Sequence, residues 1–134
     1  MFRMRRAGAE TILIVDDEPA VRLMCETILS HYAYRVISAS DGEHAIQSVC
    51  GRPELAIDLA VIDVIMPVMS GPELAIELQR LRPGLRILFV TGYPDESARL
   101  IERQQAVLRK PFTSDALISK IRELLDGPAS LAPE

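Results

Sequence analysis

Three short runs of uninterrupted apolar residues constrain the fold of this chain more than any other feature. They are ILIV at 12–15, LAVI at 59–62 and ILFV at 87–90. Two weaker runs of the same kind are YRVIS at 34–38 and AVL at 106–108. Short apolar runs without alternation are typical of strands that are covered on both faces, as in a parallel sheet. The pattern therefore predicts five buried strands.

The segments between these runs carry apolar residues at helical spacing. The residues of the clearest helical faces are Val21, Met24, Ile28, Leu29, Leu74, Leu78, Leu81, Leu117, Ile121, Leu124 and Leu125. Strand and helix thus alternate, which predicts an α/β fold: a single (βα)5 domain with a doubly wound, five-stranded parallel sheet and helices on both faces. Because crossover connections are right-handed, the flavodoxin-like strand order 2-1-3-4-5 is the expected one.

Helix start signals lie at the expected places between the strands. We expect Asp17 to cap the first helix, with Pro19 in its first turn. The segments SDGE at 40–43 and SGPE at 70–73 both have the pattern of a capping box. Thr113 is expected to cap the last helix.

Composition disfavours several classes of function. The 134 residues include 15 Lys+Arg and 19 Asp+Glu, and the net charge of −4 argues against nucleic acid as a partner. No apolar run approaches the roughly 20 residues that cross a bilayer, and no signal peptide is recognisable. Cys25 and Cys50 form no metal-binding motif, so we expect reduced core or boundary residues and a cytoplasmic location. We expect a flexible N-terminal segment at 1–10, one folded domain at 11–126 and a C-terminal tail at 127–134.

Polar residues stand where four of the five apolar runs end. Asp16, Asp17, Asp63 and Thr91 directly follow their runs, and Lys110 lies one residue further on after the last run. Because the carboxyl ends of neighbouring parallel strands lie about 4.8 Å apart at one edge of the sheet, we expect these side chains to converge. Three carboxylates at one place favour a hard divalent cation, Mg²⁺ above all, or else the raised pKa of one carboxyl group.

The amine and the hydroxyl narrow the chemistry of this site. Only two of the 15 basic residues are lysines, Lys110 and Lys120, and the compact ammonium of Lys110 suits a point contact with a phosphoryl oxygen. Thr91 adds a hydroxyl donor. Carboxylates, Mg²⁺, a lysine and a hydroxyl together are typical of phosphoryl transfer, in which one carboxylate can be the nucleophile that forms an acyl phosphate.

This set of residues resembles the receiver domain of two-component response regulators, over roughly residues 11 to 126. The matching positions are Asp16 and Asp17 for the acidic pair, Asp63 for the phosphoacceptor within VIDVIMPVMSG, Pro67 and Gly71 at the characteristic offsets, Thr91 for the switch Ser/Thr, and Lys110 within RKPF for the lysine. Each motif alone is modest, but five in register over about 100 residues are specific.

The resemblance implies that Asp63 accepts a phosphoryl group from a phosphohistidine on a histidine kinase or a histidine phosphotransfer protein. It implies Mg²⁺, with Mn²⁺ as the alternative ion. The implied ligands are Asp17 and Asp63 directly, Asp16 largely through water, and the backbone carbonyl of Ile65. Thr91 and Lys110 would receive the phosphoryl oxygens, and a cis peptide bond before Pro111 would aim Lys110 inward.

One position departs from the family's pattern. Three residues before the lysine, where the family commonly has a Tyr or Phe that turns inward, this chain has Val107. A β-branched side chain has one dominant rotamer, so the signal would have to pass through the backbone after Thr91 and Val107, or through dimerisation. Tyr93, two residues after Thr91, is a candidate modulator of access for the hydrolytic water.

The resulting prediction is a phosphorylatable switch that catalyses only its own phosphorylation and dephosphorylation. It would relay its state to an unknown downstream protein through the face formed by the fourth helix, the fifth strand and the fifth helix. We expect a stand-alone receiver or the receiver of a hybrid histidine kinase, monomeric or dimerising on phosphorylation, with no further domain after residue 126 and no nucleic-acid or membrane partner.

Three alternatives stay open at this point. The chain could be a constitutive interaction domain that keeps the fold without being phosphorylated. It could be a flavin- or nucleotide-binding protein, although DDEP at 16–19 repels anions unless a metal is bound. It could also be an aspartyl-phosphate phosphatase, although such enzymes usually carry the nucleophile on the first strand.

Overall fold

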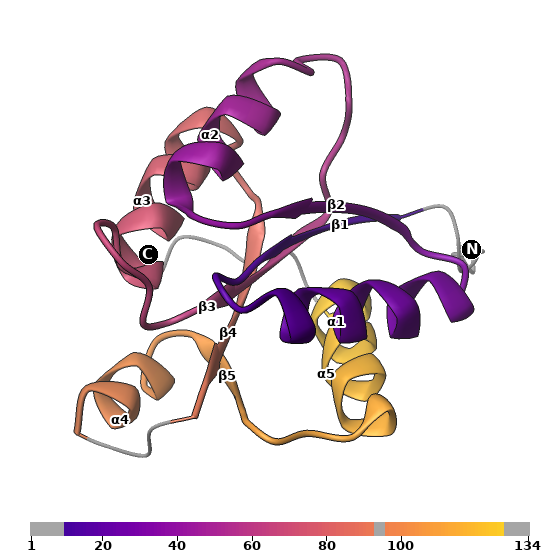
Figure 1. The fold of residues 1–134 in the computed structure, drawn as a ribbon, viewed down its shortest axis with the longest axis vertical. Helices are drawn as coiled ribbons and strands as arrows, with labels where there is room; N and C mark the ends of the chain where they lie inside the picture. Colours follow the sequence, from indigo (N-terminus) through magenta and orange to yellow (C-terminus); the bar gives the residue numbers. More distant parts are fainter. Residues whose placement is uncertain (1–9, 93–95, 128–134) are drawn as a thin grey trace.

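One parallel sheet forms the centre of the computed structural model, which describes residues 10–92 and 96–127 (Figure 1). Within these ranges its five strands are β1 (Thr11–Val15), β2 (Arg35–Ala39), β3 (Leu59–Asp63), β4 (Arg86–Thr91) and β5 (Ala106–Arg109). They lie in the order β2-β1-β3-β4-β5, and every neighbouring pair is parallel. The predicted fold class and strand order are confirmed.

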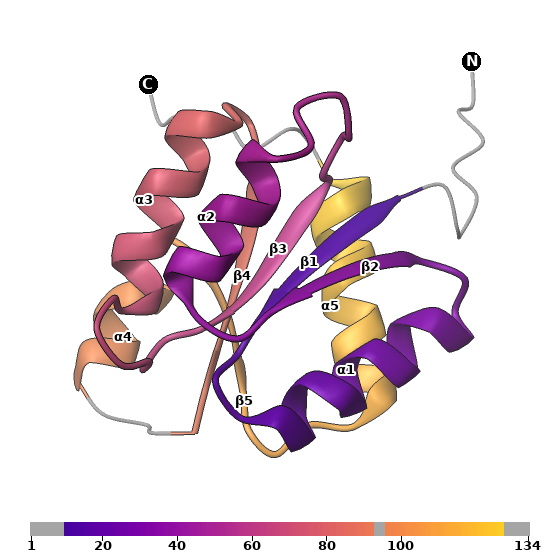
Figure 2. The same cartoon turned by 45° about the horizontal axis from the view of Figure 1, so that its top comes forward.

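Helices cover both faces of the sheet. They are α1 (Pro19–His31), α2 (Gly42–Cys50), α3 (Gly71–Leu81), α4 (Glu96–Glu102) and α5 (Ser114–Asp126). Figures 1 and 2 show α1 and α5 together on one face, with α2 and α3 on the other. This double cover explains why the strands are continuously apolar rather than alternating.

Strand β1 shows how the sequence pattern becomes a two-sided core. Ile12 and Ile14 belong to the cluster under α1 and α5, while Leu13 and Val15 belong to the cluster under α2 and α3. All four side chains are at most 1 % exposed. Successive side chains point to opposite faces of a strand, and burying each one contributes roughly 1.5–3 kcal/mol of transfer free energy.

Two of the predicted helix caps are wrong by one residue. The N-cap of α1 is Glu18 rather than Asp17, and its side chain makes no capping hydrogen bond. The N-cap of α2 is Asp41 rather than Ser40, and its carboxylate accepts the N–H of His44 at 2.8 Å. In both cases the helix begins one residue later than the sequence pattern suggests.

The other two predicted caps are confirmed. Ser70 and Glu73 form a capping box at the start of α3, in which each side chain accepts the backbone N–H of the other residue. The Thr113 hydroxyl accepts the N–H of Ala116 at 3.0 Å at the start of α5. Each such cap contributes about 1 kcal/mol to helix stability.

The folded domain begins earlier than the sequence predicts. Glu10, which was expected in the flexible segment, is 1 % exposed, and its carbonyl accepts the N–H of Arg35 at 3.0 Å. Its carboxylate lies 3.2 Å from the guanidinium of Arg122. The remainder of that segment, residues 1–9, and the tail from 128 lie outside the described residues.

The prediction for the two cysteines is confirmed only in part. Both cysteines are free, but Cys25 is buried in the core while Cys50 is exposed rather than at a core boundary. None of the described helices combines the length and the apolarity that a membrane span requires.

Candidate functional site

The backbone at the end of β1 holds Asp16 in a fixed position. The Asp16 N–H donates to the carbonyl of Ala39 at 3.3 Å, and the Asp16 carbonyl accepts from the guanidinium of Arg22 at 2.7 Å. One carboxylate oxygen of Asp16 accepts the N–H of Glu18 at 2.9 Å. Asp16 is only 3 % exposed, whereas the next residue, Asp17, is exposed. The acidic pair therefore consists of one buried, oriented carboxylate and one that faces solvent.

Asp63 is the last residue of β3, and a glycine allows the next helix to pack against it. The N–H of Val64 donates to Val90 at 2.9 Å, and the N–H of Gly71 donates to Val64 at 2.8 Å. A Cβ atom on Gly71 would lie 2.9 Å from the Val64 Cα and would also collide with the Asp63 carbonyl. Glycine at position 71 is thus required by this close approach of the backbones. The contact fixes the place of Asp63, which is 7 % exposed.

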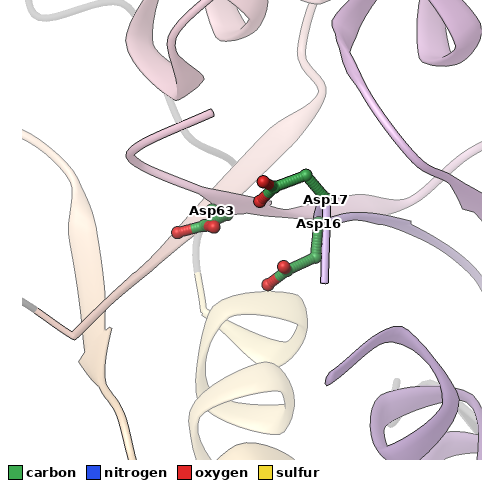
Figure 3. Close-up of side chains that lie close together, drawn as sticks. All are labelled: Asp16, Asp17 and Asp63. Atoms are coloured by element: carbon green, nitrogen blue, oxygen red, sulfur yellow. The ribbon is translucent and has the colours of Figure 1, made fainter. Parts of the chain in front are cut away.

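The three aspartates converge as predicted from the strand ends. Figure 3 shows Asp16 and Asp17 at the end of β1 and Asp63 at the end of β3, with Asp17 extending toward Asp63 and Asp16 below them. One carboxylate oxygen from each lies within 4.8 Å of those of the other two. An all-oxygen, anionic donor set of this kind fits a hard divalent cation, which takes carboxylate oxygens and keeps several waters. These residues could hold a metal ion.

Lys110 reaches into the same site from the loop after β5. The peptide bond between Lys110 and Pro111 is cis, as the resemblance implies. The ammonium nitrogen lies 3.2 Å from Asp16, 3.1 Å from Glu18 and 3.7 Å from Asp63. One ammonium group therefore contacts three carboxylates at once.

The site carries more negative than positive charge. Burial, and after it the charge of Asp16, raise the pKa of Asp63 to about 6 from its ordinary 3.8, although Lys110 acts in the opposite direction. Burial lowers the pKa of Lys110, but Glu18, Asp63 and Asp16 more than offset it, so that this pKa is raised overall. Among the described residues, one ammonium thus faces four carboxylates, counting exposed Asp17. A bound cation would relieve this imbalance.

A pocket of about 500 Å³ opens over these groups. Its lining residues are Asp17, Glu18, Asp63, Ile65, Gly92 and Lys110. It gives solvent and small molecules access to the Asp63 carboxylate and to the Lys110 ammonium. Because most of its charged groups are anionic, it would accept an anion best when a cation is bound beside it.

Thr91 ends β4 as predicted, but it does not line this pocket. It is 2 % exposed and lines a neighbouring cavity of about 310 Å³, on the side of Ile101 in α4. Its carbonyl accepts the N–H of Lys110 at 2.8 Å, so the two strand ends are joined through the backbone. Ile65 lines both cavities and is 52 % exposed.

Val107 lies on β5 beside Phe89 of β4, in register with it. Its side chain is partly buried and packs against the core cluster under α2 and α3, as does Ile101. A small residue therefore occupies the position at which the family's pattern has an aromatic ring. Tyr93, the candidate modulator, lies outside the described residues.

Sequence reasoning missed Glu18. It makes the shortest of the three contacts of Lys110 and lines the pocket. The available signal was its place directly after Asp16 and Asp17, but an exposed glutamate at a helix start is ordinarily a solvated residue. Only the position of Lys110, 92 residues further along the chain, reveals the contact.

The fold and site together define a class: a one-sheet, doubly wound α/β domain with an acidic cluster that could hold a cation at the carboxyl edge of its parallel strands. Residues 12–122 match the family model described as the response regulator receiver domain. The chain belongs to this family.

Curated relatives include much longer proteins. The sensor kinase CckA of Brucella abortus is 34% identical over 125 residues, which cover 90% of this chain and 13% of that protein. The probable transcriptional regulatory protein TcrX of Mycobacterium tuberculosis is 34% identical over 128 residues, which cover 91% of this chain and 53% of that protein. The chain thus spans from about an eighth to about half the length of these relatives.

This chain also resembles several solved structures over nearly their whole length. A CheY-like receiver domain protein from Methanospirillum hungatei superposes with a TM-score of 0.78 at 31% identity, covering 87% of this chain and 94% of that one. The receiver domain of the hybrid histidine kinase CckA gives a TM-score of 0.74 at 30% identity, covering 87% and 99%. The response regulator TrrA of Thermotoga maritima, in complex with Mg(2+)-BeF, gives 0.74 at 30% identity, also covering 87% and 99%.

Proposed function

We propose that this chain is a phosphorylatable signalling switch in which Asp63 accepts a phosphoryl group from the phosphohistidine of a histidine kinase or a phosphotransfer protein. The observation that carries the proposal is the convergence of Asp16, Asp17 and Asp63 within 4.8 Å, with the Lys110 ammonium 3.7 Å from Asp63. Apart from its own phosphorylation and dephosphorylation, we propose no catalytic activity.

In the proposed reaction, a carboxylate oxygen of Asp63 forms a bond to phosphorus while the bond from phosphorus to the donor's imidazole nitrogen breaks. The imidazole leaves with the electron pair of that bond and takes up a proton. Lys110 donates to the phosphoryl oxygens, on which negative charge is concentrated. The reaction also requires that these groups are held in place before the donor arrives, and the ends of the strands provide this positioning.

The metal in this proposal is Mg²⁺, with Mn²⁺ as the alternative ion. Asp17, Asp63 and the backbone carbonyl of Ile65 would hold it directly, and Asp16 largely through water. Bound there, it would neutralise charge on the carboxylates and on the phosphoryl oxygens. The donor set of the aspartates and the Mg(2+)-BeF complex of the relative TrrA support this ion.

We propose that the arrangement described here is the resting state. Thr91 lines the cavity beside α4 rather than the acidic pocket, so it would have to move toward Asp63 to bind a phosphoryl oxygen. Since Val107 provides no ring that could turn inward, the change would pass through the backbone after Thr91 and Val107. The face of α4, β5 and α5 would then be read by a downstream protein or by a second phosphorylated copy.

The context of the domain is also part of the proposal. The relatives that share its sequence include a sensor kinase and transcriptional regulators, which supports a role as the receiver of a hybrid histidine kinase or of a separate response regulator. We propose a cytoplasmic location on the same grounds.

The test is incubation with acetyl phosphate and Mg²⁺, followed by intact-mass measurement. The parent protein should gain the mass of one phosphoryl group, and Asp63→Asn should gain none. Asp115→Asn is the matched control, because Asp115 is an exposed aspartate in the first turn of α5. If the parent gains no mass, or if Asp63→Asn gains the same mass, the chain is instead a constitutive interaction domain on this fold.

A further inference from the structure

The Glu18 carboxylate does not cap α1, the helix that it precedes. Glu18 is the N-cap of α1, a position at which Ser, Asp or Asn side chains commonly accept a backbone N–H, but its own side chain makes no such bond. Its N–H is already satisfied by Asp16 at 2.9 Å. The carboxylate instead contacts the Lys110 ammonium at 3.1 Å, and both residues line the pocket.

Glu18 differs from the other two carboxylates that contact Lys110. The side chains of Asp16 and Asp63 are 5% and 9% exposed, whereas that of Glu18 is 61% exposed. Its contact with the ammonium is also shorter than that of Asp63, 3.1 Å against 3.7 Å. Lys110 thus contacts a long, solvent-facing side chain that makes no capping hydrogen bond to α1.

We propose that Glu18 is a positioning residue that restrains Lys110 in the resting state and so slows the phosphorylation of Asp63; this inference rests on the proposed function. A phosphoryl oxygen needs the same ammonium that Glu18 engages. The Glu18 charge, which lines the pocket, also opposes the approach of an anionic phosphodonor. Both effects slow phosphorylation, since the Glu18 carboxylate competes with the phosphoryl group for the Lys110 ammonium and also repels the anionic phosphodonor.

The kinetic test uses Glu18→Gln, which keeps the shape of the side chain and removes its charge. Rates of phosphorylation by acetyl phosphate should rise about two- to five-fold, the range expected for an exposed ion pair. Release of Lys110 should raise the rate constant at saturating acetyl phosphate. Loss of repulsion should lower the acetyl phosphate concentration that gives half of this rate. The difference from the parent should shrink at high ionic strength, because exposed charges are screened.

Glu123→Gln is the matched control, because Glu123 is an exposed glutamate that pairs with the other lysine, Lys120, at 3.5 Å. It should phosphorylate at the parent rate. If Glu18→Gln is as slow as the parent and Glu123→Gln, or slower, the restraint does not exist.

A second readout needs no phosphorylation. Because the chain has only two lysines, brief labelling with acetic anhydride and peptide mapping compares Lys110 directly with Lys120. In Glu18→Gln the labelling of Lys110 relative to Lys120 should increase severalfold, and an unchanged ratio would overturn the restraint. An increased ratio in a protein that accepts no phosphoryl group would support the restraint and reject the proposed function.

Discussion

The two ends of strand β1 each carry a buried carboxylate, but in opposite electrostatic settings. Glu10, just before the strand, is 1 % exposed and lies 3.2 Å from Arg122, whose guanidinium also binds Asp126 at 2.7 Å and the Tyr34 hydroxyl at 2.7 Å. Asp16, just after the strand, is 3 % exposed and shares the single ammonium of Lys110 with two other carboxylates.

This difference separates a structural ion pair from a binding site. At the Glu10 end a guanidinium, with several donors in a fixed plane, pairs with Glu10, Asp126 and the Tyr34 hydroxyl. At the Asp16 end the negative charge exceeds what the described residues neutralise, and the site is open to solvent. Excess buried charge costs free energy unless something binds, so the carboxyl end of the sheet gives up stability that a ligand can restore.

The largest effect is expected at the Glu10 end, where a buried carboxylate is paired with a guanidinium. Arg122→Met should lower the free energy of unfolding by about 2–4 kcal/mol in urea titrations, because the buried Glu10 carboxylate would lose its ion pair with the Arg122 guanidinium. Arg80→Met is the control, since Arg80 pairs with Glu77 on the surface, with side chains 70% and 44% exposed. That change should cost about 0.5 kcal/mol or less. Equal losses in the two variants would remove the distinction between the ends of β1.

At Asp63, removing the charged group is expected to raise the free energy of unfolding rather than to lower it. Its pKa is raised to about 6 by burial and by Asp16, so the folded state keeps the proton to a higher pH than the unfolded state does. The stability of the metal-free protein should therefore fall as the pH rises from about 4 to about 6, and remain lower above that range. Asp63→Asn, which has no proton to lose, should be more stable than the parent by about 1–3 kcal/mol at pH 7.

Urea titrations of both proteins at pH 4, 5, 6 and 7 without divalent ions measure this difference. Asp115→Asn, at an exposed position, serves as the control and should follow the parent at every pH. If Asp63→Asn is less stable than the parent at pH 7, the Asp63 carboxylate is compensated after all.

The two ends also differ in how far the sequence predicts them. Asp16, Asp63 and Lys110 follow apolar runs, and the geometry of parallel strands brings such positions to one edge, so their convergence could be predicted without coordinates. The Glu10–Arg122 pair joins residues 112 positions apart, and no periodicity connects a residue before the first strand to the last helix.

Details within the site were less predictable for a related reason. Strand-end position places Thr91 at the correct edge, but it does not tell which of two adjoining cavities the residue lines. The predicted cap of α1 is wrong because the Asp16 carboxylate accepts the N–H of Glu18, and Glu18 rather than Asp17 is the N-cap. Both outcomes depend on the path of the loops, which is set by packing rather than by local propensity.

The smallest expected effect tests whether the excess charge at the carboxyl end is a metal site. Mg²⁺ at ten times its dissociation constant should raise the free energy of unfolding of the parent by about 1.4 kcal/mol, because it binds the folded state only. Asp17→Asn should lose most of this gain, since it removes an anionic donor without disturbing a buried side chain. Arg122→Met should keep it in full, because β1 separates the two ends by roughly 17 Å and effects at such distances add. A gain of equal size in Asp17→Asn would mean that the ion binds elsewhere, and a reduced gain in Arg122→Met would mean that the two ends are coupled through the sheet.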